Sequence, residues 1–233
     1  MEPLYFHDSI QIKAPISKVW EVLTKPEYME AWFDLAADYS SMKGEPLKLG
    51  SEILWKNDEH KVYVKGEVIE LEKEKLLTTS LYDEAWKIKL APEEVAYSYT
   101  LTENKEGTLL ELKFGDFTKV PEGEKIYQDF VGAPKNTEFE KIKMLAEGLT
   151  KLEAEGYTEL RVCPLPPKVD TGEHTHEVQT SHIILTGELK IKDISGVKYF
   201  KPGDFVEFPV GTTHKAKGLT EKGMMIVGVK HNK

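Results

Sequence analysis

Histidines are concentrated in the last third of this 233-residue chain. Four of the seven lie within 41 residues, at His174, His176, His182 and His214. His174 and His176 are two residues apart in GEHTHEV, and alternate residues of a β-strand project to the same side. Imidazole nitrogen is a common ligand of divalent transition metals. This spacing therefore predicts that His174 and His176 bind one metal ion together.

A second segment, GDFVEFPVGTTH, runs from Gly203 to His214. Pro209 and Gly211 are residue types that turn the chain, so His214 is predicted at the start of a further strand. The two segments together resemble the cupin family. His174, His176 and Gly187 match its first motif, and the second motif is matched by residues with the family's spacing: Gly203, Pro209, Gly211 and His214. The resemblance implies a small all-β barrel in which His214 is the third metal ligand.

Two positions depart from the cupin pattern. The family's usual glutamate ligand falls at Thr180, which is a poor metal ligand, and the closing asparagine falls at Gly218. A neutral three-histidine set favours iron, nickel, zinc or copper over magnesium or calcium. His182 lies two residues beyond Thr180 and so shares its face. We consider His182 as a candidate catalytic residue, with a replacement ligand, a substrate-binding group and a structural histidine as alternatives.

The preceding residues predict an α+β domain. Alternating apolar residues indicate a strand at Phe6–Lys13, and Pro15 and Pro26 suit the first turns of two helices. Five further strand-like runs, at 53–55, 61–71, 76–81, 96–102 and 108–114, are joined mostly by short polar connections typical of an antiparallel meander. A helix is predicted at 136–155 from its apolar period, with Gly156 as the stop signal. We therefore expect domains at residues 1–156 and 157–233.

The segment IKAPISKVWEVLTKPEYMEAWF, at Ile12–Phe33, resembles the opening of homologues of the heat-shock-protein-90 ATPase activator. Those proteins have the helix-grip fold of START-like (SRPBCC) proteins, and the resemblance covers about residues 4–155. It implies a cavity for an apolar ligand between the sheet and the long helix, or a surface for a chaperone partner. Aromatic residues on the strands and their connections are candidates for lining such a cavity, although such residues more often belong to the core: Trp55, Trp86, Tyr97 and Tyr99.

Charge and composition exclude several classes of function. Residues 1–156 contain 20 Lys and 31 Asp or Glu, a net charge of −11, whereas residues 157–233 carry +2. The chain has one arginine, Arg161, so nucleic-acid binding, which needs cationic groups against phosphates, is not expected. A single cysteine, Cys163, suits a reducing compartment. No run of about 18 apolar residues indicates a membrane span, and we expect a cytoplasmic protein.

These observations lead to two hypotheses of function. The first is a two-domain, small-molecule-binding metalloprotein with an apolar cavity in the helix-grip domain and a three-histidine metal site in the cupin. If it is an enzyme, the resemblance implies a metal-dependent dioxygenase or isomerase. The second is a non-enzymatic sensor or co-chaperone-like protein with a degenerate cupin used for dimerisation. A barrel of about 77 residues is small, and we therefore expect a homodimer.

Overall fold

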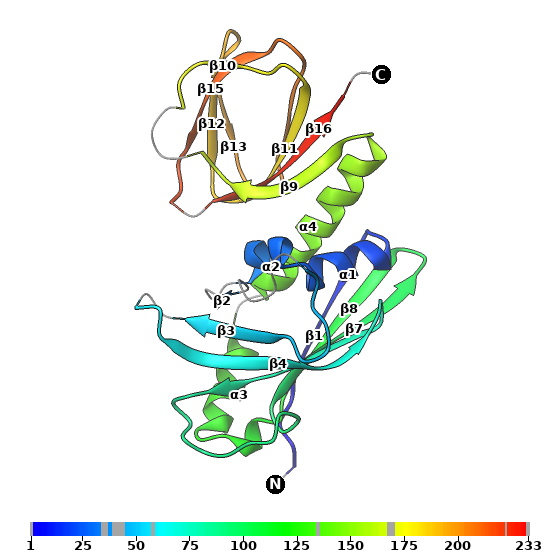
Figure 1. Cartoon of the computed structure of the whole chain (residues 1–233), viewed down its shortest axis with the longest axis vertical. Coiled ribbons are helices and arrows are strands. Elements are labelled where there is room, and N and C mark those ends of the chain that lie inside the picture. Colours follow the sequence, from blue (N-terminus) through cyan, green and yellow to red (C-terminus); the bar gives the residue numbers. More distant parts are fainter. Residues whose placement is uncertain are drawn as a thin grey trace. The chain divides into compact units, whose positions relative to one another are not determined.

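The computed structural model describes residues 2–33, 37–38, 45–56, 59–133, 136–166, 171–221 and 223–231. The chain divides into two compact units, residues 1–143 and 144–233. This division falls within the long helix α4 (Thr137–Ala154). A domain boundary after residue 156 stays a prediction. Each unit is described separately below, and Figure 1 gives the element labels.

The first unit is an eight-stranded antiparallel sheet with helices (Figure 1). Its strands follow the order β1-β8-β7-β5-β4-β3-β2, and β6 pairs with β4. The strands are β1 (Phe6–Ile12), β2 (Ala37–Asp38), β3 (Glu52–Lys56), β4 (Val62–Glu72), β5 (Leu76–Ser80), β6 (Tyr82–Asp83), β7 (Ala96–Asn104) and β8 (Gly107–Gly115). The helices are α1 (Ile16–Thr24), α2 (Pro26–Trp32), the 3-10 turn η2 (Phe117–Lys119), α3 (Gly123–Gly132) and the first part of α4.

The helices of this unit form where local residues favour them. Pro26 is the first residue of α2, where its missing N–H has no intrahelical partner to lose. Asn136 precedes α4, and its side-chain oxygen accepts hydrogen bonds from the backbone N–H groups of Glu138 and Phe139, at 3.1 and 3.2 Å. The α+β architecture is as predicted. Helix α3 was not predicted, although its apolar residues follow a helical period; among its ten residues only Gly123 is buried.

The second unit contains two four-stranded antiparallel sheets, ordered β10-β15-β12-β13 and β14-β11-β16-β9. Their strands are β9 (Thr158–Pro164), β10 (His174–Thr175), β11 (Gln179–Thr186), β12 (Leu189–Asp193), β13 (Gly196–Phe200), β14 (Phe205–Phe208), β15 (Thr213–Gly218) and β16 (Met224–Lys230). This confirms the predicted all-β second domain. Among the described residues, the strand pairings form two sheets rather than one closed ladder.

The core of the second unit lies between these two sheets. Ile191 and Ala216 from one sheet and Ile184, Phe208 and Val227 from the other belong to a single cluster of buried side chains. The side chains of β11 that alternate with Ile184 point away from this core. They face the part of α4 that belongs to this unit. There, a Cβ atom on Gly148 would lie only 2.7 Å from Ile226 Cδ1. The sheet that carries β11 is therefore covered by the helix on one face and by the core on the other.

Candidate metal centre

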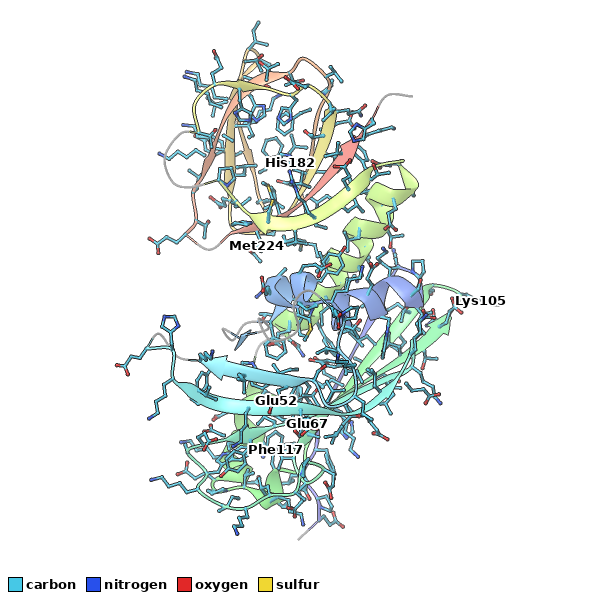
Figure 2. All side chains as sticks on the ribbon, viewed as in Figure 1. Glu52, Glu67, Lys105, Phe117, His182 and Met224 are labelled. Atoms are coloured by element: carbon cyan, nitrogen blue, oxygen red, sulfur yellow. The ribbon has the colours of Figure 1, made fainter. Side chains whose placement is uncertain are left out.

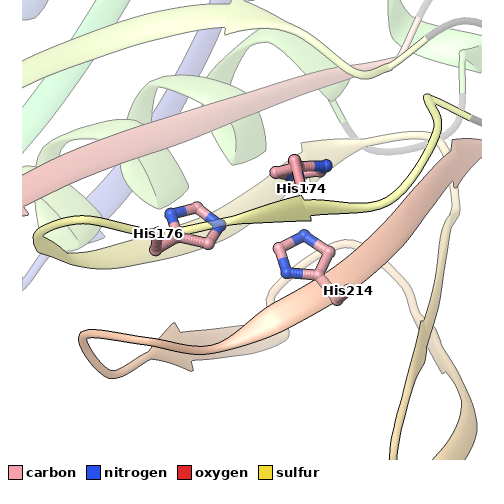
Figure 3. Close-up of side chains that lie close together, drawn as sticks. All are labelled: His174, His176 and His214. Atoms are coloured by element: carbon pink, nitrogen blue, oxygen red, sulfur yellow. The ribbon is translucent and has the colours of Figure 1, made fainter.

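Two of the three predicted ligands lie on neighbouring strands of the second unit, and the third directly follows one of these strands (Figure 3). His174 in β10 is the register partner of His214 in β15. His176 follows β10 and stays on the same ladder, since its N–H donates to Thr212 O at 3.0 Å and its carbonyl accepts from Gly211 N at 2.8 Å. Strand alternation and cross-strand pairing thus place all three imidazoles on one side of the sheet.

The three imidazoles are close enough to share an ion. One ligand atom from each ring lies within 4.8 Å of the other two. Ring centroids are separated by 5.5 Å for His174 and His176, 4.4 Å for His174 and His214, and 4.9 Å for His176 and His214. Nitrogen ligands at about 2.0–2.1 Å from a tetrahedral ion are on the order of 3–4 Å apart. The donor set therefore fits a metal after a small approach of the rings.

Burial keeps two of these imidazoles, His176 and His214, in the form that binds metal. His214 is buried, His176 is partly buried and His174 is exposed, so the group extends from the core to the surface. Burial, with the charges of His174 and His176, lowers the pKa of His214 to about 4. Burial and His174 also lower the pKa of His176. Both rings are thus neutral near pH 7, and a neutral imidazole has a free lone pair for a metal.

The residue at the glutamate position supports the site in another way. Thr180 is buried in β11, and its hydroxyl lies 2.9 Å from His176 Nδ1. This contact leaves Nε2 as the nitrogen of His176 that is available for a metal. No described residue lies within hydrogen-bonding reach of the buried Nε2 of His176 or the buried Nδ1 of His214. Buried polar atoms without partners are unusual in native structures, which is consistent with a ligand role.

His182 lies beside the three predicted ligands and is not a member of the group that could hold a metal. Figure 2 marks it on β11. Its ring centroid is 6.3 Å from that of His176, and it makes an edge contact with Phe208 at 5.1 Å. Burial, and then the charges of neighbouring histidines, lower the pKa of His182 to about 3. Its Nδ1 is buried, and no hydrogen-bond partner for it is found in the described part of the chain.

Phe208 is a component of the site that sequence reasoning missed. Its ring is 2% exposed and stacks on His214 at 4.1 Å and on His176 at 4.9 Å, with interplanar angles of 14° and 3°. It therefore packs against the planes of two of the predicted ligands. The sequence did contain one indication of this role. Phe208 lies two residues after Val206 in β14, so the two side chains share a face, and it directly precedes Pro209. That alternation predicts an inward side chain but not which rings it meets.

The first unit contains a separate cavity of about 570 Å³. Three of the four predicted aromatic residues line it: Trp55, Tyr97 and Tyr99. The rest of its wall includes Phe33, Phe114, Phe130 and Leu112, with Asp8 and Glu138 among the polar groups. Trp86 is not among the lining residues of this cavity. It makes an edge contact with Tyr82 at 6.0 Å and packs on a cluster that contains Phe117.

Two family models match the chain. The one described as "Activator of Hsp90 ATPase homolog 1-like protein" matches residues 13–143, and the one described as "Cupin domain" matches residues 161–229. No curated protein matches the chain. Among the described residues, no helix is both long and apolar enough to cross a membrane.

Several solved structures are similar to one part of the chain or the other. A Mesorhizobium loti protein is 24% identical with a TM-score of 0.47, over 62% of this chain and 97% of that one. A Nitrosomonas europaea protein is 18% identical with a TM-score of 0.46, over 63% and 96%. A cupin-2 domain containing protein from Shewanella frigidimarina is 19% identical with a TM-score of 0.27, over 30% and 69%.

Proposed function

The chain belongs to the family of activator of Hsp90 ATPase homolog 1-like proteins, through residues 13–143, and carries a cupin domain at residues 161–229; we propose that it is a small-molecule-binding metalloprotein. In this proposal the cupin holds a divalent transition metal on His174, His176 and His214. The supporting observation is that one nitrogen from each of these rings lies within 4.8 Å of the others.

The donor set favours iron, nickel, zinc or copper. Three neutral nitrogens suit these ions, whereas magnesium and calcium prefer oxygen ligands. With no carboxylate among the three ligands, a bound divalent ion would keep its charge and act as a Lewis acid toward a small oxyanion or enolate. The protein's own residues hold the site in place: Thr180 orients His176, and Phe208 supports the rings of His176 and His214.

His182 is the candidate for proton transfer in this proposal. Its pKa, lowered to about 3, keeps the ring neutral near pH 7, so in the resting site it can accept or donate a hydrogen bond. To act as a base it would need a bound ligand that raises this pKa toward the working pH. It lies on the same face of β11 as Thr180. A metal-dependent dioxygenase or isomerase is the reaction class that we propose for an active enzyme, with His182 as the proton-handling residue.

The first unit is proposed to bind an apolar small molecule. Its cavity of about 570 Å³ falls in the range of about 300–1,000 Å³ that is usual for ligand sites. Aromatic side chains form much of the wall, with Trp55, Tyr97 and Tyr99 as proposed contacts. Asp8 and Glu138 also belong to the wall, and their negative charge disfavours an anionic ligand. A chaperone partner for this unit remains a secondary proposal, on the family resemblance alone.

Elemental analysis of the purified protein tests the metal site. We expect about one equivalent of a transition metal in the native chain and its loss in the double variant His174→Ala, His176→Ala. The matched control, His7→Ala with His231→Ala, removes the same number of imidazoles outside the site and should keep the metal. A native protein that takes up no metal, even after incubation with iron, nickel, zinc and copper salts, would contradict the proposal.

A non-enzymatic protein is the second candidate function, and Thr180 is the observation that favours it. The position of the family's carboxylate ligand carries a hydroxyl that contacts His176, which is compatible with a cupin that serves as a sensor or a dimerisation module. The same elemental analysis separates the two candidates, because a metal-free cupin cannot carry out the chemistry proposed above. Homodimerisation is tested by analytical ultracentrifugation, and a monomer at micromolar concentration would contradict it.

A further inference from the structure

Two pairs of lysines lie directly opposite each other on neighbouring strands of the second unit. Lys190 in β12 is the register partner of Lys217 in β15, and Lys192 is the partner of Lys215. Residues paired in this way have Cβ atoms about 4.5–5.5 Å apart, and like charges at such positions destabilise a sheet. Four ammonium groups are therefore concentrated on a small area, at a cost to the fold.

These lysines project away from the core. The residues between them, Ile191 and Ala216, are buried in the core cluster, so the lysines must face the opposite side of the sheet. The edge strand β13 adds Tyr199 beside Lys190 and Val197 beside Lys192. Tyr199 is 66% exposed and Val197 is 45% exposed. We call this surface the lysine face, and its members are Lys190, Lys192, Lys215, Lys217, Val197 and Tyr199.

The lysine face has no counter-charge within the described residues. None of its four lysines forms an ion pair with a residue that the structure describes. Asp193, the acidic residue at the end of β12, pairs with Lys198 at 3.5 Å. By themselves, Lys190 and Lys192 would be an ordinary solvated pair on one strand. The register of β15 against β12 changes that interpretation, because it doubles the charge by adding Lys215 and Lys217.

We propose that the lysine face is a docking surface for an extended acidic segment of a partner protein. The charge of the face calls for an anionic partner. Alternate residues of an extended chain are about 6.4–6.8 Å apart, and the same spacing separates Lys190 from Lys192 and Lys215 from Lys217 along their strands. A segment with an acidic residue at every second position thus places its carboxylates opposite the lysines. Tyr199 and Val197 supply apolar contact beside them.

The composition favours a protein partner over a nucleic acid. The face contains no arginine, the residue best suited to bidentate contacts with bases and phosphates, and Tyr199 is its one aromatic group, whereas single-stranded nucleic acids usually stack on several. The chain as a whole carries a net charge of −9, which repels a long polyanion. A short acidic segment makes contact with the face alone and avoids most of this repulsion.

Fluorescence anisotropy with the full-length protein tests the proposal. The probe is a labelled peptide in which Glu and Ser alternate, and a peptide that alternates Lys and Ser is the charge control. We expect saturable binding of the acidic probe at low ionic strength, weakening steeply with salt. The double variant Lys190→Gln, Lys217→Gln should bind it about 2- to 30-fold more weakly, as expected for two lost exposed ion pairs. Its thermal midpoint should be unchanged or higher, because the substitution removes a like-charge pair.

A matched control and a competitor decide the outcome. Lys105→Gln with Lys201→Gln removes the same charge at two exposed positions outside the face, and it should leave the probe affinity unchanged. Lys192→Gln with Lys215→Gln serves as a second face variant in case the first is destabilised. Three results would overturn the proposal: absence of binding at millimolar probe, equal weakening by the control variant, or tighter binding of an oligonucleotide of equal charge than of the acidic peptide.

Discussion

The hydroxyl oxygen of Thr180 lies 2.9 Å from Nδ1 of His176. Thr180 stands where the cupin motif has a carboxylate ligand, and its side chain contacts a histidine that we propose as a ligand. A hydrogen bond to one ring nitrogen of a histidine ligand fixes the tautomer and the orientation of the ring. The other nitrogen is then directed toward the position of the metal. The contact therefore gives this position a supporting role in a site that consists of histidines.

Removal of that hydrogen bond should weaken metal binding. We expect Thr180→Val, which preserves the shape of the side chain, to lower the affinity for metal about 10- to 100-fold, the usual effect of losing a group that orients a ligand. Isothermal titration calorimetry on the metal-stripped protein measures the change. Thr180→Ser keeps the hydroxyl and should retain most of the affinity. Equal losses in the two variants would contradict an orienting role.

The ring of Phe208 should be important for stability as well as for the site. Phe208→Ala removes a side chain that is 2% exposed, and such truncations cost about 3–5 kcal/mol. Denaturant unfolding followed by far-UV circular dichroism is the suitable measurement, because all four tryptophans belong to the first unit. Phe130→Ala, at a residue that is 39% exposed, is the control and should cost much less. Similar losses in both variants would show that the stacked ring has no special packing role.

Metal binding should stabilise the native chain. A ligand that binds only the folded state adds about 2.7 kcal/mol when its free concentration is about 100 times Kd. We therefore expect a chelator to lower the thermal midpoint of the native protein and added metal to restore it. The variant His174→Ala, His176→Ala should show neither response. If the chelator removes the metal without changing the midpoint, the site is not coupled to folding.

Blocking the cavity of the first unit should reduce the binding of apolar molecules. Val131 lines this cavity and is 53% exposed, so Val131→Trp adds volume there without overpacking a core. We expect weaker binding of an uncharged, environment-sensitive naphthalene dye, measured by fluorescence titration. Ile194→Trp places the same new side chain at an exposed position of the second unit and is the control. Unchanged dye affinity in Val131→Trp would argue against this cavity as the binding site.

Asp116 should make the stability of the first unit depend on acid. Its carboxylate accepts hydrogen bonds from the backbone N–H of Leu4 and from the N–H and hydroxyl of Thr118, at 2.8–2.9 Å. Burial alone would raise the pKa of Asp116, but these hydrogen bonds hold it below its ordinary value. A lowered pKa in the folded state stabilises the protein above the unfolded pKa of about 3.9, and this stabilisation is lost as the pH falls through the folded value.

The corresponding variant is Asp116→Ala. We expect it to cost about 1.5–3 kcal/mol at pH 7, the range for a hydrogen bond to a charged group, and less as the pH falls below about 4. Denaturant titrations at several pH values measure the difference. Asp129→Ala, at an exposed carboxylate of α3, is the control and should give only a small loss. A constant loss for Asp116→Ala over this range would contradict the assignment.

Local patterns predicted much of the secondary structure. The strand at Phe6–Ile12 and the helix at Thr137–Ala154 lie within a residue of their predicted ends, because period-two and period-3.6 alternation reflect burial directly. Helix α3 was missed although its apolar residues follow a helical period, and it is mostly exposed, with Gly123 as its one buried residue. Trp86 illustrates a further limit, since aromatic character predicts burial but not whether the ring meets a cavity or another cluster.

The sequence alone predicted the group of three histidines, because the spacing of His174 and His176 and the turn before His214 are properties of one strand and one loop. Only the tertiary structure decided what surrounds that set. Thr180 and Phe208 reach the histidines from β11 and β14, strands of the opposite sheet. The pairing of Lys190 with Lys217 likewise depends on the register of two strands. Contacts between distant segments follow from how the sheets pack, and no local spacing encodes them.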